Sequence, residues 1–391
     1  MLKVGIDSIA FYSSQYYLDL EDLAVKRGIR QDKFAKSLGQ KKMAVPPPDE
    51  DVITMAANAA FEAIKDIDTS AIEILLFATE SGIDQSKAGG IYIHDLLGLP
   101  ERCRVVELKQ ACYSATMALQ LAIPFIKENP DKKVLLVASD IARYGIESTG
   151  ESSQGAGSVA MVLSNNPRLI AFDKEYGVVT ANVMDFWRPN YTDEAFVEGK
   201  YSSKLYLQML EKAWQQYTTL SSREFKDHDY YCYHMPVPRL VETAHQHLAK
   251  VSGSKETNKD FLQKTISPAL SYGREIGNSY SASLYVGLAS LFDFADDDMT
   301  NKRIGFYSYG SGCVAEYFSG TVQPEYKKAL KTQSHKAMLE KRKKLSYEEY
   351  EKFYKFNYPE DGKSLEIPKH DTGVFRLAAI RDHQRIYEKV V

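Results

Sequence analysis

Three sequence patterns each occur twice in this chain, in the same order, and this repetition constrains the fold more than any other feature. The pairs are GAGSVAMVLSNNP (155–167) with GSGCVAEYFSGTV (310–322), CYSATMALQLA (112–122) with SYSASLYVGLA (279–289), and LLFATE (75–80) with DYYCYH (229–234). One glycine followed by a small-residue strand is common in α/β proteins. Three matches that keep their order indicate a duplicated unit.

We therefore expect two fused halves, residues 1–168 and 169–391, with a seam near residues 166–178. Short apolar strands alternate with helical patterns, which indicates an α/β architecture. Residues 326–391 mix both charge signs at helical spacing and predict surface helices packed on the body, with a loop at 359–373. The expected strands are 2–11, 73–79, 133–140, 157–164, 229–234 and 303–310, and the expected helices are 50–67, 110–126, 203–218, 239–251 and 281–294.

The composition excludes several classes of protein. Hydrophobic residues make up 44% of the chain and the net charge is −3, so no overall basic field exists to hold nucleic acid or an anionic membrane. No apolar run reaches the ~20 residues that span a bilayer, and the start lacks the features of a signal peptide. The four cysteines form no C-x-x-C pair. We therefore expect reduced thiols and a cytoplasmic location.

Cys112 is expected where a strand over 104–108 turns into a buried helix over 110–126, a stretch without a charged side chain. Pro124 predicts a bend or an end of that helix. The first N–H groups of a helix lack internal acceptors and carry partial positive charge. A thiolate there would be stabilised, which predicts a lowered pKa for Cys112. The alternative is a small buried hydrophobe, the usual place of a free cysteine.

Two further residues end apolar strands. Glu80 ends the strand of the first half, and His234 ends its counterpart in the second half. Ligands of parallel α/β sheets bind at the carboxyl ends of the strands. We expect Glu80 and His234 to converge on one pocket, where desolvation raises the pKa of the glutamate toward that of a general acid or base. Taken singly, each is more often a structural residue.

Six ordered motifs together resemble the 3-hydroxy-3-methylglutaryl-CoA synthase family, bacterial type. They are ELKQACYSATMAL, VASDIARYG, GAGSVAMVLS, DYYCYHMP, REIGNSYSASLY and FYSYGSGCVAEYFSG, and the resemblance runs from about residue 3 to 320. It implies a thiolase-like fold, a duplicated α/β unit in five α-β-α-β-α layers. It also implies the condensation of acetyl-CoA with acetoacetyl-CoA in the mevalonate pathway. Coenzyme A thioesters are then substrates, no cofactor or metal is expected, and the superfamily usually forms homodimers.

The resemblance also assigns roles. Cys112 matches the nucleophile that becomes acetylated, Glu80 the acid/base that removes a methyl proton, and His234 the residue that hydrogen-bonds the ketone oxygen of acetoacetyl-CoA. The chemistry needs these groups, because attack by the thiol creates an oxyanion and a methyl group beside a thioester requires a positioned carboxylate. The further matches are Asn278, Ser311 and Tyr144 as substrate contacts, Ser153 and Ser202 as weaker ones, and Asp140 and Asp185 as carboxylates behind the site.

The expected contacts to the CoA phosphates depart from the family pattern. The family often has two lysines after the histidine, and this chain has Arg239 and, near the second position, Thr243. His245 and His247 are further candidates for phosphate binding, although neutral imidazoles are weak phosphate partners. Arg30 and Lys33 fall where the family places an N-terminal CoA contact, and solvated surface charge is an equally good interpretation.

Three alternatives stay open at this point. The initiating ketoacyl synthase of fatty-acid synthesis shares the fold and would also use Cys112, His234 and Asn278, but it needs no glutamate base. Thiolase proper would need a second cysteine, for which Cys313 in a strand is a poor candidate. A non-catalytic protein on this fold is the third. A metal site is disfavoured, because His245 and His247 stand two apart on a helix.

Overall fold

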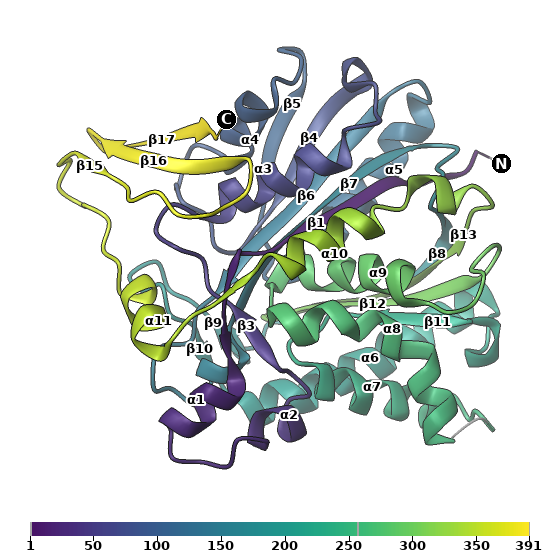
Figure 1. Ribbon diagram of the computed structural model, residues 1–391. Coiled ribbons are helices and arrows are strands. Elements are labelled where there is room, and N and C mark those ends of the chain that lie inside the picture. Colours follow the sequence, from purple (N-terminus) through teal and green to yellow (C-terminus); the bar gives the residue numbers. More distant parts are fainter. Residues whose placement is uncertain (1, 256–257, 391) are drawn as a thin grey trace.

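The duplication is visible in the order of the strands in the central sheet. The computed structural model describes residues 2–255 and 258–390. Its nine-stranded sheet has the order β11-β12-β13-β8-β1-β7-β6-β4-β5 (Figure 1). The strands are β1 (Val4–Tyr12), β4 (Ile72–Ala78), β5 (Arg104–Leu108), β6 (Lys133–Ala142), β7 (Gly155–Asn165), β8 (Ile170–Thr180), β11 (Tyr230–Tyr233), β12 (Arg303–Gly310) and β13 (Val314–Val322).

Read outward from its centre, this sheet has the same pairing pattern on both sides. β7 pairs antiparallel with β1 and β6, and β6 pairs parallel with β4. Likewise β13 pairs antiparallel with β8 and β12, and β12 pairs parallel with β11. Only two residue pairs join β1 to β8, at Gly5–Ala171 and Ile6–Ile170. The match between β4 and β11 places Glu80 and His234 at equivalent strand ends.

The sheet halves and helices form layers. α3 packs on β1, β6 and β7, and α6 packs on β8 and β13, so these helices cover the outer faces. α5 contacts the strands of the first half, and α9 contacts β1, β7, β11 and β12. A hydrogen bond of 2.9 Å between Thr116 of α5 and Tyr285 of α9 joins these two helices between the halves. The helices are α1 (Leu20–Lys26), α2 (Lys33–Ser37), α3 (Val52–Ala63), α4 (Gly89–Leu97), α5 (Ser114–Glu128), α6 (Gly199–Ser221), α7 (Pro238–Val251), α8 (Lys259–Ile276), α9 (Ser283–Phe294), α10 (Thr332–Glu340) and α11 (Tyr347–Tyr354).

Local chemistry explains where the helices begin and end. Asp51 caps α3 by accepting hydrogen bonds of 3.0 Å from the backbone N–H groups of Ile53 and Thr54. α5 begins at Ser114, later than expected, and runs through Pro124 to Glu128. The expectation that the helix ends at Pro124 is wrong. The proline lies in the last turns of α5 and removes only one internal N–H bond.

The C-terminal segment differs from the expected surface helices. α10 and α11 are helical, but the chain then forms a β-hairpin whose first strand contacts α3. Asp49, which is fully buried, accepts hydrogen bonds from Arg376 and His370 and so holds the hairpin on the first half. The remaining short strands are β2 (Tyr16–Asp19), β3 (Lys42–Ala44), β9 (Phe186–Trp187), β10 (Phe196–Val197), β14 (Lys343–Lys344), β15 (Leu365–Glu366), β16 (Phe375–Arg381) and β17 (Gln384–Lys389).

Candidate active site

Glu80 and Cys112 meet at the carboxyl ends of two adjacent parallel strands. β4 ends at Ala78 and β5 ends at Leu108, and the two strands pair in parallel. The Cys112 thiol donates a hydrogen bond of 3.0 Å to Glu80 Oε1. Burial raises the pKa of Glu80 to about 8, and the neighbouring Asp140 carboxylate adds to the shift. The expected raised pKa of a desolvated acid/base is thus present.

Cys112 does not have the lowered pKa that its place near a helix predicted. Burial raises its pKa well above the ordinary value, and the Glu80 carboxylate adds to the shift. The reason is that α5 begins two residues later, at Ser114, and that the thiol faces a carboxylate instead of a cation. Removal of the thiol proton therefore depends on an adjacent base.

Asp140 fixes the strand end that carries Glu80. Its Oδ1 accepts hydrogen bonds from Glu80 N at 2.9 Å and from Ser81 N and Oγ at 3.0 and 2.8 Å. Its Oδ2 accepts from the backbone N–H of Ser281 at 3.0 Å and from the Ser281 hydroxyl. Ser281 belongs to the second half, so this fully buried carboxylate connects both halves behind the site.

His234 is oriented by the start of α9. Its Nδ1 lies 2.7 Å from the hydroxyl of Ser283, which also accepts a hydrogen bond of 3.2 Å from Met235 N. Burial lowers the pKa of His234 to about 3, so the ring is neutral at neutral pH. Among the described residues, no hydrogen bond joins His234 directly to Cys112 or Glu80. The turn at Ser281–Ser283 links His234 indirectly to the Glu80 strand end. Ser281 contacts Asp140, and Ser283 contacts His234.

Asn278 and Tyr144 lie together beside this turn. The Asn278 side-chain amide donates to the Tyr144 hydroxyl at 3.3 Å, and its oxygen accepts from Tyr280 N at 2.9 Å. The charges of Cys112 and Glu80 each act on the pKa of Tyr144, which burial raises. The structure therefore brings Asn278 and Tyr144 to the Glu80–Cys112 pair.

Asp185 connects two other predicted positions, Ser202 and the turn at Ser311. Its fully buried carboxylate accepts a hydrogen bond of 3.1 Å from the Ser202 hydroxyl and one of 2.9 Å from Gly312 N, next to Ser311. The backbone carbonyl of Ser311 accepts a hydrogen bond of 3.1 Å from Gln110, two residues before Cys112. Cys313 is buried in the connection between β12 and β13, not inside a strand as expected.

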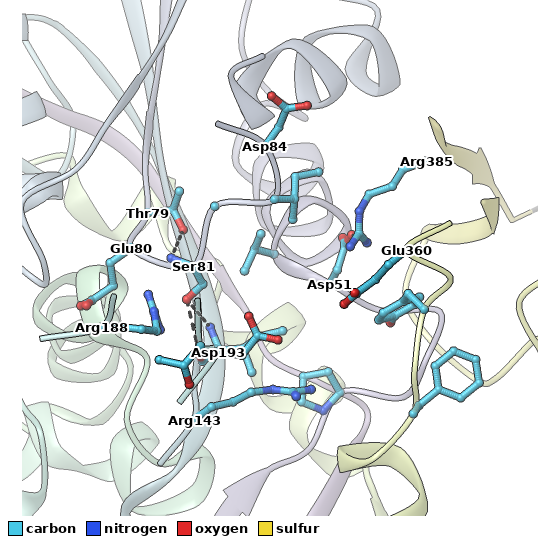
Figure 2. Close-up of a pocket in the computed structure, with 18 of the residues that line it drawn as sticks. Asp51, Thr79, Glu80, Ser81, Asp84, Arg143, Arg188, Asp193, Glu360 and Arg385 are labelled. Atoms are coloured by element: carbon cyan, nitrogen blue, oxygen red, sulfur yellow. Dashed lines mark hydrogen bonds and ion pairs between the residues drawn. The ribbon is translucent and has the colours of Figure 1, made fainter. Parts of the chain in front are cut away.

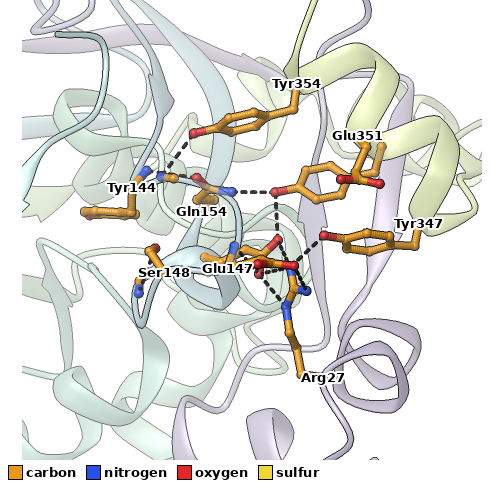
Figure 3. Close-up of polar contacts among 12 residues, drawn as sticks. Arg27, Tyr144, Glu147, Ser148, Gln154, Tyr347, Glu351 and Tyr354 are labelled. Atoms are coloured by element: carbon orange, nitrogen blue, oxygen red, sulfur yellow. Dashed lines mark hydrogen bonds and ion pairs between the residues drawn. The ribbon is translucent and has the colours of Figure 1, made fainter.

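The loop that carries Tyr144 and Ser153 is held by the C-terminal segment (Figure 3). Gln154 accepts from Tyr144 N at 2.8 Å and donates to the Tyr350 hydroxyl at 3.0 Å. Arg27 forms an ion pair of 2.7 Å with Glu151 in the same loop. The Ser153 hydroxyl donates to the carbonyl of Gly150 at 2.7 Å, which commits it to the turn of the loop.

The expected phosphate contacts lie on one exposed patch. The N-terminus of α7 docks on the end of α2, where Arg239 N donates to the Leu38 carbonyl at 2.9 Å. Arg30 and Lys33 are exposed on the neighbouring segment. The Arg30 side chain pairs with Asp32, and that of Arg239 pairs with Glu242. The patch therefore holds basic side chains from both halves of the chain.

His245 cannot reach this patch. It is fully buried between the Tyr233 and Thr265 hydroxyls, each at 2.9 Å, and burial lowers its pKa to about 3. The suggestion that it assists in phosphate binding is wrong, because its face of α7 packs on the core. His247 lies 3.4 Å from Glu211 instead.

A groove of about 1490 Å³ opens on Glu80 (Figure 2). Sequence reasoning did not identify its other lining residues, which come from distant segments brought together only by the fold. Arg188 stands three residues after Asp185 and was not among the predicted site residues. The labelled lining residues are Asp51, Thr79, Glu80, Ser81, Asp84, Arg143, Arg188, Asp193, Glu360 and Arg385.

The described residues contain neither a candidate metal cluster nor a candidate membrane-spanning helix. Within residues 2–255 and 258–390, no group of three or more His, Cys, Asp or Glu side chains is placed to hold a metal ion. No helix in the described part of the chain has both the length and the apolar character needed to cross a membrane.

Comparison with known proteins decides the family. Residues 2–167 match the family model described as hydroxymethylglutaryl-coenzyme A synthase N terminal, and residues 245–370 match the corresponding C terminal model. The chain belongs to the hydroxymethylglutaryl-CoA synthase family. It is 37% identical to hydroxymethylglutaryl-CoA synthase of Enterococcus faecalis over 386 residues, which cover 99% of this chain and 100% of that protein. The resemblance seen in the six motifs is thereby confirmed.

Solved structures of this family have the same fold. A crystal structure of HMG-CoA synthase complexed with CoA matches with a TM-score of 0.94 and 41% identity, covering 99% of this chain and 100% of that one. MvaS in complex with 3-hydroxy-3-methylglutaryl coenzyme A matches with a TM-score of 0.90 and 34% identity, covering 100% and 99%. The thiolase-like fold is thus confirmed. A related branch includes the Bacillus subtilis polyketide biosynthesis 3-hydroxy-3-methylglutaryl-ACP synthase PksG, 35% identical over 91% of this chain and 89% of that protein.

Proposed function

We propose that this chain condenses acetyl-CoA with acetoacetyl-CoA and water to give 3-hydroxy-3-methylglutaryl-CoA and CoA, as a step of the mevalonate pathway. The observation that carries the proposal is the 3.0 Å contact between the Cys112 thiol and Glu80 at adjacent strand ends. A ketoacyl synthase would have no use for a carboxylate at that place. Family membership and the relatives bound to CoA and HMG-CoA support the same reaction.

The first half-reaction is acetylation of the cysteine. The Glu80 carboxylate accepts the thiol proton, and the Cys112 sulfur attacks the acetyl carbonyl carbon of acetyl-CoA. The carbon–sulfur bond to CoA then breaks, and the CoA thiolate takes up a proton and leaves. The proton-accepting carboxylate speeds this step, because the buried thiol holds its own proton tightly.

The second half-reaction forms a carbon–carbon bond. Glu80 removes a proton from the methyl group of the acetyl-cysteine, and the resulting carbanion equivalent adds to the ketone carbon of acetoacetyl-CoA. The neutral His234 ring donates a hydrogen bond to the ketone oxygen, and the alkoxide that forms takes up a proton from solvent. Because Ser283 accepts from Met235 N, its own hydroxyl proton can point to His234 Nδ1, which leaves a proton on Nε2 for the substrate. Water then hydrolyses the enzyme thioester and restores Cys112.

The other site residues act as supports in this proposal. Asn278 and Tyr144 hold the acetoacetyl group, and Asp140 and Asp185 fix the segments that carry Glu80 and Ser311. Arg30, Lys33 and Arg239 bind the phosphates of CoA, and Ser153 and Ser202 lie along its path. The CoA thioesters are the substrates, and the reaction as written uses no cofactor or metal.

The assembly we propose is a homodimer in the cytoplasm. β5 is an edge strand of the nine-stranded sheet, and Val106 on it is 46% exposed, so a second copy could extend the sheet there. The four cysteines are unpaired, which suits a reducing compartment. Light scattering on the purified chain tests the dimer, and a monomeric mass would contradict it.

An assay of acetyl-CoA-dependent loss of acetoacetyl-CoA tests the reaction itself. We expect the wild type to consume acetoacetyl-CoA and Cys112→Ser to lose at least about 1,000-fold in kcat, because an unactivated hydroxyl replaces the thiol. The matched control is Cys103→Ser, a buried thiol far from the site. A Cys112→Ser variant with near-normal turnover would rule out the covalent mechanism.

A further inference from the structure

Arg188 points at the catalytic carboxylate from the groove side. It follows β9, three residues after Asp185, and its guanidinium lies beside Glu80 in the groove (Figure 2). Glu80 is 9% exposed and accepts its hydrogen bond from a neutral thiol. The buried acid/base therefore has a cation next to it on the one side that opens to solvent.

Arg188 is not committed to another partner. Among the described residues, it forms no hydrogen bond and no ion pair. The other arginines of the groove do: Arg143 stacks on the Tyr354 ring and donates to its carbonyl, and Arg385 pairs with Asp51 at 3.0 Å. A half-buried cation without a structural partner beside a buried carboxylate is an arrangement that serves the carboxylate.

We propose that Arg188 is a positioning residue that sets the pH at which Glu80 becomes a competent base. The proposal rests on the role of Glu80 in the proposed function. The positive charge favours the ionised carboxylate, which must exist before it can accept a proton from the thiol or from the acetyl methyl group. Arg188 touches neither the thiol nor the carbonyl carbon in this account.

Other groups around Glu80 also act on its pKa. Asp140 on β6 raises the pKa of Glu80, whereas the hydrogen bond from Cys112 and the charge of Arg188 lower it. Arg188 also lowers the pKa of Tyr280, whose ring lies near Tyr144. The remaining charged groups along this part of the groove are Asp84, Glu107, Lys109, Arg143, Asp193 and Glu360. Without the charge of Arg188, only the hydrogen bond from Cys112 would oppose burial and Asp140, both of which favour the protonated form of Glu80.

The test is the pH profile of kcat/KM for wild type, Arg188→Met and Arg188→Lys. A base that must be ionised gives an acidic limb near its pKa. We expect Arg188→Met to move this limb up by about one pH unit, the effect of one charge across several ångströms at a protein-like dielectric. kcat/KM then falls about tenfold below the limb and stays near wild type on the alkaline plateau. Arg188→Lys should keep the limb within about 0.3 unit of wild type.

Lys363→Met is the matched control, because Lys363 lines the same groove and pairs with the exposed Asp361. The acidic limb of the Lys363→Met profile should stay at the wild-type pH. Acetylation of Cys112 by labelled acetyl-CoA at high pH should also survive in Arg188→Met. A uniform loss at every pH, or an unmoved limb, would overturn the role of Arg188 while wild-type turnover stands. Absence of condensation in the wild type would instead overturn the proposed function.

Discussion

Cys112, the proposed nucleophile, holds its proton tightly in the free protein. Its sequence neighbours suggested a thiolate at a helix N-terminus, yet the helix begins two residues later and the thiol donates to Glu80 at 3.0 Å. The lowered pKa that the sequence suggested for Cys112 is therefore wrong, whereas its role as nucleophile stays a prediction. The pKa depends on which charge the fold brings to the thiol, and Glu80 stands 32 residues away in the chain.

Alkylation of Cys112 by iodoacetamide measures this coupling at the level of one residue. The Glu80 carboxylate raises the pKa of the thiol, so Glu80→Gln should lower that pKa and speed alkylation at pH 9 by roughly three- to tenfold. Burial keeps the pKa above its ordinary value in both proteins, so the rate should rise with pH throughout. The modified residue is identified by peptide mass spectrometry. Slower alkylation in Glu80→Gln would contradict the sign of the coupling.

At the level of elements, the strands and helices with strong periodicity were predictable. All seven expected strands and all five expected helices occur, and only the strands over 104–108 and 303–310 have the expected ends. The C-terminal hairpin of β16 and β17 was not expected, because its polar and charged residues show no simple alternation. Its place depends on Arg376, whose side chain is 7% exposed and pairs with the fully buried Asp49, 327 residues away. Such a partner cannot be read from a local pattern.

Arg376→Met tests whether this ion pair anchors the hairpin. The substitution leaves the Asp49 carboxylate buried and partly unpaired, so we expect the free energy of unfolding in urea to fall by about 3–5 kcal/mol. Arg381→Met, on the same strand, removes an exposed pair with Glu366 and should cost less than about 1 kcal/mol. Equal effects of the two substitutions would show that the Asp49 contact does not anchor the hairpin.

For the whole molecule, the repeat carried most of the prediction. It predicted Glu80 and His234 at equivalent strand ends, and these residues follow β4 and β11, which have matching places in the mirrored strand order. The family resemblance supplied the expected roles of the site residues. Neither half of the chain indicates these roles alone. What the sequence did not provide are the contacts between the halves, such as Tyr113 with Glu316 at 2.6 Å and Asp140 with Ser281. These depend on three-dimensional packing.

Gly155 tests how far the two halves depend on one another. A Cβ atom added there would lie 2.4 Å from the Ile276 carbonyl oxygen and 2.6 Å from Asn278 N, both backbone atoms of the second half. Gly155→Ala should therefore push the Asn278 segment away from β7. We expect a rise in the KM for acetoacetyl-CoA of about tenfold or more and a lower midpoint in urea. Gly199→Ala, at a glycine with no atom within 4 Å of the added Cβ and no positive φ, is the control for loss of glycine without a clash. An unchanged KM in Gly155→Ala would contradict close packing of the halves at this point.

The most direct measurement of the central claim follows the two half-reactions separately in Glu80→Ala. Incubation with labelled acetyl-CoA at pH 9, followed by peptide mass spectrometry, reports acetyl groups on Cys112, and consumption of acetoacetyl-CoA reports condensation. We predict that Cys112 of Glu80→Ala still acquires acetyl groups, more slowly than in the wild type. The variant should form no 3-hydroxy-3-methylglutaryl-CoA. Condensation at the wild-type rate in Glu80→Ala, or acetyl groups absent from Cys112 in the wild type, would contradict it.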